Sequence, residues 1–160
     1  MFLDVPTPPS WTRELGPAAP DQGAAGTGTG SESVEESGRA LYYFPIAGTA
    51  AAAGEPVLLM VSPMLPLSSS LPTLLEEAVK SEPDFQIEWR WPLLLSRVGP
   101  WELVLLMVVG RSAEQRITTG RIYAAFDAGY GTFLVVLLDR DPNRLAARKN
   151  ELCELLARAR

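Results

Sequence analysis

The longest apolar run in the chain is residues 101–109, which only Glu102 interrupts and Gly110 closes. A transmembrane helix needs about 20 apolar residues, so this run is too short to span a bilayer. Its β-branched residues and the bounding glycines favour a strand. Residues 57–61 and 133–138 have the same character. None of the three runs alternates with polar residues, so we expect both faces of these strands to meet apolar surface.

The remaining apolar pattern predicts further strands. Phe85, Ile87, Trp89 and Trp91 alternate strictly with polar residues, which indicates a strand with one face in water. The glycine-containing residues 127–131 predict a hairpin loop. A short edge strand is expected at Phe2–Val5, before Pro6. The other predicted strands are residues 40–46, 56–62, 93–98, 115–126 and 132–138.

Two segments have the period of amphipathic helices. Residues 71–81 follow the N-cap candidate Ser70, and residues 143–159 follow Asp141-Pro142, a cap followed by a first-turn proline. The apolar positions of the first are Leu71, Leu74, Leu75, Ala78 and Val79, and those of the second are Leu145, Leu152, Leu155, Leu156 and Ala159. On the second helix, we expect Arg144, Arg148, Lys149 and Arg158 to face water.

At 160 residues the chain has the length of one domain. We divide it into an N-terminal edge strand (1–12), an acidic glycine-rich loop expected to be disordered (13–38) and a folded domain (39–160). The order of elements predicts an α+β fold. Its expected form is an antiparallel sheet of six to seven strands with two helices packed mainly on one face.

Two helices of this length cover about one face of such a sheet, which leaves a second apolar face to explain. A second copy of the chain, the glycine-rich loop or a foreign apolar peptide could cover it, and the loop has too few apolar residues. A one-residue slip exchanges the two faces, so the pattern leaves open which residues point outward. The candidate groove or core residues are Leu59, Val61, Leu103, Leu105, Met107, Leu134 and Val136.

The composition limits the kinds of catalysis and binding that the chain can perform. The chain has no histidine, which excludes Ser-His and Cys-His catalysis and histidine metal ligation. A net charge of −5 argues against nucleic-acid binding, and the single cysteine, Cys153, cannot form an internal disulfide. The N-terminus lacks the basic and apolar regions of a signal peptide, so we expect a cytoplasmic protein. We interpret the carboxylates of Glu76-Glu77, Asp139 and Asp141 as solvated or helix-capping groups. We expect no enzyme activity, metal or cofactor.

Several stretches together suggest a family. They include Leu3-Asp-Val-Pro followed by Trp11, Tyr43-Phe-Pro-Ile, Pro83 to Trp91, Gly99 and Arg121-Ile-Tyr. With these stretches, residues 41–157 resemble the PsbP/DcrB-like fold and are most similar to the effector-associated (Eag) chaperones of type VI secretion.

The resemblance implies a homodimeric, non-catalytic chaperone. It would shield apolar transmembrane-type helices of a secreted effector in a groove of its sheet before export, without inserting into the membrane itself. It adds Arg121 and Tyr123 to the candidate groove, although Leu75 and Arg121 stand where the family tends to have glutamine. The alternative is a structural or assembly subunit whose apolar face is permanently buried in an oligomer.

Overall fold

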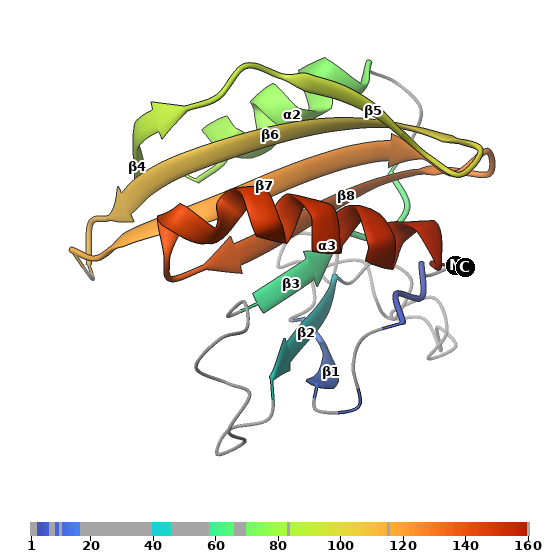
Figure 1. Cartoon of the computed structure of the whole chain (residues 1–160), viewed down its shortest axis with the longest axis horizontal. Coiled ribbons are helices and arrows are strands. Elements are labelled where there is room, and N and C mark those ends of the chain that lie inside the picture. Colours follow the sequence, from blue (N-terminus) through green and yellow to red (C-terminus); the bar gives the residue numbers. More distant parts are fainter. Residues whose placement is uncertain are drawn as a thin grey trace, which may run out of the picture.

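A computed structural model describes residues 3–6, 9, 11–16, 40–45, 58–65, 70–82, 84–114 and 116–159 of the chain. These residues form an eight-stranded antiparallel sheet with two α-helices, so the predicted α+β class is confirmed (Figure 1). Residues 17–38 of the predicted glycine-rich loop (13–38) lie outside the described residues, as does the predicted turn at 47–54. Residues 13–15 of that predicted loop instead belong to a strand, Trp11–Leu15.

The strands follow the order β1-β2-β3-β8-β7-β6-β4, and β5 also pairs with β6, beside β4. Most predicted strands are present within one to three residues of their expected ends. Their bounds are β1 Trp11–Leu15, β2 Leu41–Pro45, β3 Leu58–Val61, β4 Phe85–Arg90, β5 Leu94–Val98, β6 Trp101–Ser112, β7 Thr118–Asp127 and β8 Thr132–Asp139. The helices are α2 Leu71–Lys80 and α3 Leu145–Ala157, with a 3-10 turn, η3, at Pro142–Arg144.

The apolar run predicted to be central is β6, and both of its faces are buried. All side chains from Leu103 to Val108 are at most 8% exposed. The antiparallel register pairs Leu103 with Phe126 and Val104 with Ala125 of β7, so alternate residues of both strands share a face. Fully burying one such leucine or valine stabilises the fold by about 1.5–3 kcal/mol, which makes this strand pair the centre of the core.

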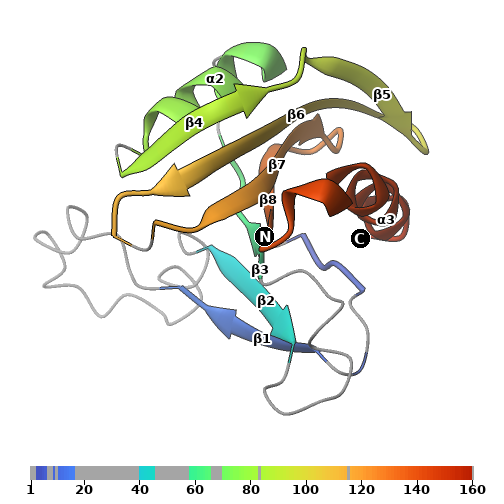
Figure 2. The ribbon, with the colours of Figure 1, turned by 60° about the vertical axis from the view of Figure 1, so that its left-hand side comes forward.

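The two helices lie on opposite faces of the sheet, which corrects the expectation that both pack mainly on one face. Leu75 of α2 belongs to the apolar cluster that contains Val104, Leu106 and Val108. Three leucines of α3 (Leu145, Leu152 and Leu156) belong instead to the cluster that contains Leu103, Leu105 and Met107. Figure 2 shows the strands of the sheet between the two helices. The physical reason is that β6 is apolar on both sides, and each side needs its own cover.

The N-terminal residues complete the cover of the α3 face. Leu3 and Val5 are 0% and 2% exposed and pack in the α3 cluster with Tyr43 of β2. The Val5 backbone N–H donates a 3.4 Å hydrogen bond to the Tyr43 hydroxyl. Residues 3–6 therefore cover the sheet instead of forming the expected edge strand, and the described edge strand at this end is Trp11–Leu15.

A β-bulge in β4 changes the face on which its tryptophans lie. Ile87 pairs with Gly110 of β6 but Trp89 pairs with the adjacent residue, Val109, so β4 has one extra residue here. Phe85 consequently packs in the α2 cluster, whereas Trp91 packs in the α3 cluster. The strict alternation from Phe85 to Trp91 predicted one shared face, and that expectation is corrected.

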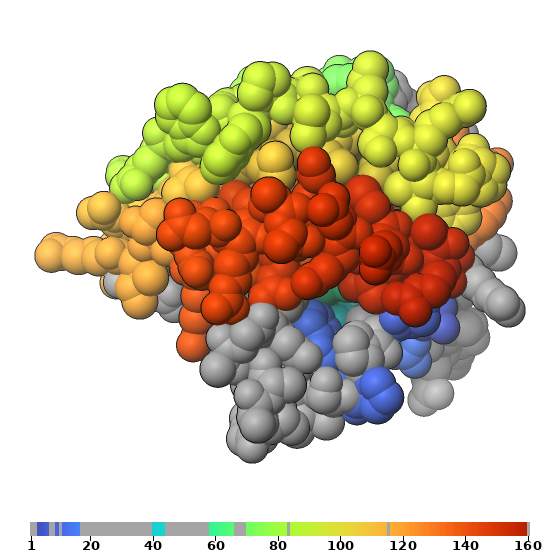
Figure 3. Space-filling view, in the orientation of Figure 1, coloured from blue at the N-terminus to red at the C-terminus, as the bar shows by residue number. Residues whose placement is uncertain are grey.

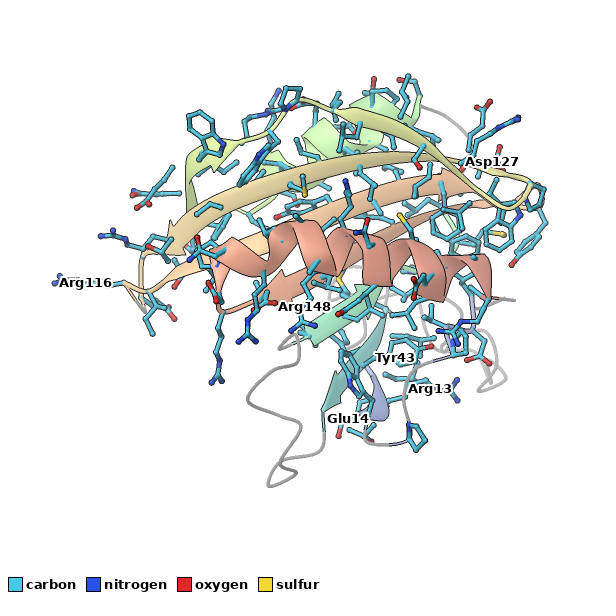
Figure 4. The ribbon with its side chains drawn as sticks, viewed as in Figure 1. Arg13, Glu14, Tyr43, Arg116, Asp127 and Arg148 are labelled. Carbon is cyan, nitrogen blue, oxygen red and sulfur yellow. The ribbon has the colours of Figure 1, made fainter. Side chains whose placement is uncertain are left out.

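A buried ion pair fixes α3 to the end of β8. Figure 4 labels its arginine, Arg148, on α3. Arg148, expected to face water, is only 6% exposed and donates to Asp139 from Nε over 2.6 Å. Its Nη1 donates to Glu151 over 2.7 Å. Asp139, itself 2% exposed, also accepts the Asp141 backbone N–H at the turn into η3. The carboxylate therefore sets both the turn and the position of the helix.

Replacing Asp139 by asparagine should destabilise the fold by about 2–4 kcal/mol, because the buried Arg148 charge loses its most buried partner. The measurement is urea unfolding followed by circular dichroism. Asp4→Asn is the matched control, because Asp4 and its partner Arg13 are exposed and their ion pair should contribute nothing measurable. Equal effects of the two substitutions would contradict the role given to the buried pair.

Candidate functional site

Six apolar side chains on the α2 face of the sheet remain partly exposed, beyond the strands that α2 covers. They come from three adjacent strands, β2, β3 and β8. The register places Tyr42 opposite Met60 and Met60 opposite Val136, so the side chains form a continuous surface. We call this surface the α2-side strip, and its members are Tyr42, Leu58, Met60, Leu134, Val136 and Leu138.

Helix α2 borders the strip because it sits over β6 and β7. Leu75 is 0% exposed over these strands. Ser70 caps the start of the helix, because its hydroxyl accepts the Thr73 backbone N–H. Arg90 of β4 donates two hydrogen bonds to Glu76, of 2.5 Å and 3.1 Å. This pair ties the outer side of α2 to the edge of the sheet, so the helix is held away from β8 and β3.

Arg121 lies at the border between α2 and the strip. Its register partner on β8 is Leu138, and its guanidinium forms an ion pair with Glu82, just beyond the end of α2. The guanidinium carbon also lies 3.8 Å from the centre of the Phe85 ring, a cation–π geometry. Among the described residues, the Arg121 Nε is buried and makes no hydrogen bond.

Tyr123 connects this charged corner to the core. Its hydroxyl accepts a 3.4 Å hydrogen bond from Arg121 Nη1, while the side chain is 1% exposed. Burial raises the pKa of the Tyr123 hydroxyl above its ordinary value, and the Arg121 charge and hydrogen bond oppose part of that rise. The hydroxyl therefore stays neutral at physiological pH and acts as a hydrogen-bonding group.

The structure divides the predicted groove residues between the two faces. Five of them are at most 8% exposed beneath α3 and residues 3–5, where no partner can reach them: Leu59, Val61, Leu103, Leu105 and Met107. The other four lie on the α2 face, where Tyr123 is buried and Arg121, Leu134 and Val136 remain partly exposed. The last two belong to the strip, and Arg121 borders it.

Four strip residues were missing from the predicted set: Tyr42, Leu58, Met60 and Leu138. Leu58 and Met60 alternate with the predicted Leu59 and Val61 in the same strand, so the apolar pattern marked all four equally. Only the register of β3 against β8 assigns Leu58 and Met60 to the less covered face. Tyr42 could have been found by extending that register to β2.

The potential metal-binding and nucleophilic side chains can be examined among the described residues. No group of three metal-binding side chains occurs among them. Burial raises the pKa of the Cys153 thiol, which lowers its reactivity, and the side chain packs against the α3 cluster. No helix in the described part of the chain combines the length and apolar character needed to cross a bilayer.

Comparison with known proteins yields no match to this chain among family models, curated proteins or solved structures.

Replacing Arg121 by methionine should raise the pKa of Tyr123 further, because the nearby positive charge and its hydrogen bond are what lower it. The pKa is measured by NMR titration of tyrosine labelled with ¹³C at the ring carbon that bears the hydroxyl. Arg90→Met, which removes a guanidinium elsewhere on the α2 face, should leave Tyr123 unchanged. A Tyr123 pKa that falls, or stays constant, in Arg121→Met would contradict the described geometry.

Lowering the pH should weaken the attachment of α2 to β4. The hydrogen bonds from Arg90 lower the pKa of Glu76 below its ordinary value of 4.5 in the folded protein. The stability that ionised Glu76 adds to the fold is therefore fully present above its ordinary pKa. This stability is lost as the pH falls through the lowered pKa. Because both side chains are more than a third exposed, we expect at most about 1 kcal/mol.

Urea unfolding at a series of pH values measures this dependence, and Glu76→Gln should flatten it in the acid range. Glu77→Gln is the control, because Glu77 is the exposed neighbour of Glu76. Identical pH profiles of the wild type and Glu76→Gln would refute this account.

Proposed function

We propose that this chain is a non-catalytic adaptor or chaperone that shields an apolar helix of a partner protein on the α2-side strip. The observation that carries the proposal is the position of the strip beside α2 on the same face of the sheet. The described residues supply one helix to this face, and the apolar surface beside it has no second helix from them.

The dimensions of the strip fit one helix. Strands β8, β3 and β2 are adjacent, and neighbouring strands are about 4.8 Å apart, so their outer axes span about 10 Å. A helix with side chains is about 10–12 Å wide and packs about 8–10 Å from a neighbouring helix. A guest helix could thus lie alongside α2 and contact Val136 and Met60 at the centre of the strip.

The character of the strip indicates an apolar guest. Its six members carry no charge, and the one polar atom among their side chains is the Tyr42 hydroxyl. A transmembrane-type segment of a secreted effector, held in the cytoplasm before export, has the required chemistry. Such segments aggregate in water unless their apolar surface is covered. The chain would keep the segment dispersed without performing a reaction on it.

The test uses a fluorescently labelled model helix of 20 leucine and alanine residues with lysines at both ends, titrated with the protein and followed by fluorescence anisotropy. We expect saturable binding that Val136→Lys and Met60→Lys each weaken at least tenfold, because each places a charge in the apolar contact. Leu95→Lys is the control, since Leu95 is 82% exposed on β5 and far along the sheet from the strip.

Binding that is absent, or that all three lysine variants reduce equally, would refute the proposal. Light scattering of the protein alone provides the second test. A fixed oligomer that Val136→Lys dissociates would instead favour a structural subunit that buries the strip permanently. Circular dichroism of each variant separates loss of binding from loss of folding.

A further inference from the structure

A second apolar concavity lies on the opposite face of the sheet, between β4 and the start of α3. It has a volume of about 440 Å³. Four of its walls come from the sheet (Trp89, Trp91, Met107 and Val109), and Leu145 and Ala146 close it from the helix. In the space-filling view, atoms of β6 are visible between β4 and α3, where this pocket opens (Figure 3).

The β-bulge creates the pocket by bringing both tryptophans onto the α3 face. The Trp91 backbone N–H donates to the Met107 carbonyl over 3.0 Å, so the register after the bulge is firmly set. The two indole rings lie 6.3 Å apart at 84° and form perpendicular walls. Trp89 nevertheless remains 61% exposed, an unusual state for the largest apolar side chain.

The chemistry of the pocket selects an uncharged ligand. Asn143 provides the one side-chain amide among the described lining residues, and the indole N–H groups of Trp89 and Trp91 are the other polar side-chain groups. The charged residues nearest in sequence are paired, because Glu88 pairs with Arg111, Arg90 with Glu76 and Asp141 with Arg144. Apolar and aromatic walls with a few polar groups are typical of small-molecule sites, and their usual volume of about 300–1,000 Å³ includes this one.

The edge of the sheet favours a small molecule over an added peptide strand. The bulge interrupts β4, Pro92 follows its end, and Glu88 and Arg90 place charges along it. These features are the ones that protect edge strands from pairing with another chain. The pocket itself stays open beside this protected edge.

We propose that this pocket binds a compact, uncharged aromatic small molecule. The ligand ring lies against the indole of Trp89, fills the space above Met107 and exchanges a hydrogen bond with the Asn143 side chain. This site is separate from the α2-side strip, because the two lie on opposite faces of the sheet.

The experiment titrates the full chain with 2-naphthol, a flat molecule with one hydroxyl, and detects binding by saturation-transfer NMR and calorimetry. A ligand of this size should bind with a dissociation constant of roughly 1 mM or below. Ala146→Trp fills the pocket from an exposed position on α3 and should abolish saturable binding. Ala147→Trp is the matched control, because the neighbouring alanine is also exposed but is not among the described lining residues.

We further expect Trp89→Ala to weaken binding about tenfold and Ala147→Trp to change it less than twofold. Equal binding by Ala146→Trp and Ala147→Trp, or the absence of saturable binding up to the solubility limit of 2-naphthol, would overturn the proposal. Val136→Lys should not affect 2-naphthol, and Ala146→Trp should not affect the model helix. Failure of one proposal is therefore distinguishable from failure of the other.

Discussion

Burial of β6 on both faces is the constraint on which the rest of the structure depends. A strand whose successive side chains are all apolar cannot expose either face without a large cost, so the fold must place cover on both sides. Helix α2 provides that cover for Val104, Leu106 and Val108, and α3 provides it for Leu103, Leu105 and Met107. With one helix used on each side, neither face of an eight-stranded sheet is covered by helices alone.

The two faces of the sheet differ in how the strands beyond the helices are covered. On the α3 side, Leu3 and Val5 extend the cover across β2 and β3, and the cluster is continuous from β2 to β6. On the α2 side, the side chains of β8, β3 and β2 stay partly exposed. This asymmetry, and not a general excess of apolar sheet, localises the candidate binding surface.

Local signals were sufficient to predict most elements, but the placement of the helices and of the exposed side chains depended on distant contacts. Ser70 and Asp141 cap their helical segments as expected, because capping involves residues only two or three positions apart. The assignment of Leu59 to the core and Met60 to the surface required the pairing of β3 with β8, which joins residues more than 70 positions apart. The two-residue period of a strand shows which residues share a face, but it does not show which of the two faces is exposed.

Charged residues misled the prediction at α3 for a related reason. Arg148 lies on the buried stripe of α3, three residues after Leu145 and four before Leu152, and it was expected in water only because it is charged. Asp139 at the end of β8 supplies a buried carboxylate for it. The helical period therefore marks the position as buried, but only the end of the preceding strand shows how its charge is satisfied. Burial of a charge is thus a property of the partner's position as much as of the helix pattern.

The β-bulge in β4 makes the aromatic surface of this edge a property of strand pairing. Removing the residue between Ile87 and Trp89 would leave Trp89 opposite Val109 without a bulge, so Trp89 and Trp91 would stay on the α3 side. A chain that kept this residue but paired it regularly with β6 would instead carry both indoles on the other side of the sheet. The accommodation of one extra residue as a bulge, more than any substitution, therefore gives this edge its aromatic side.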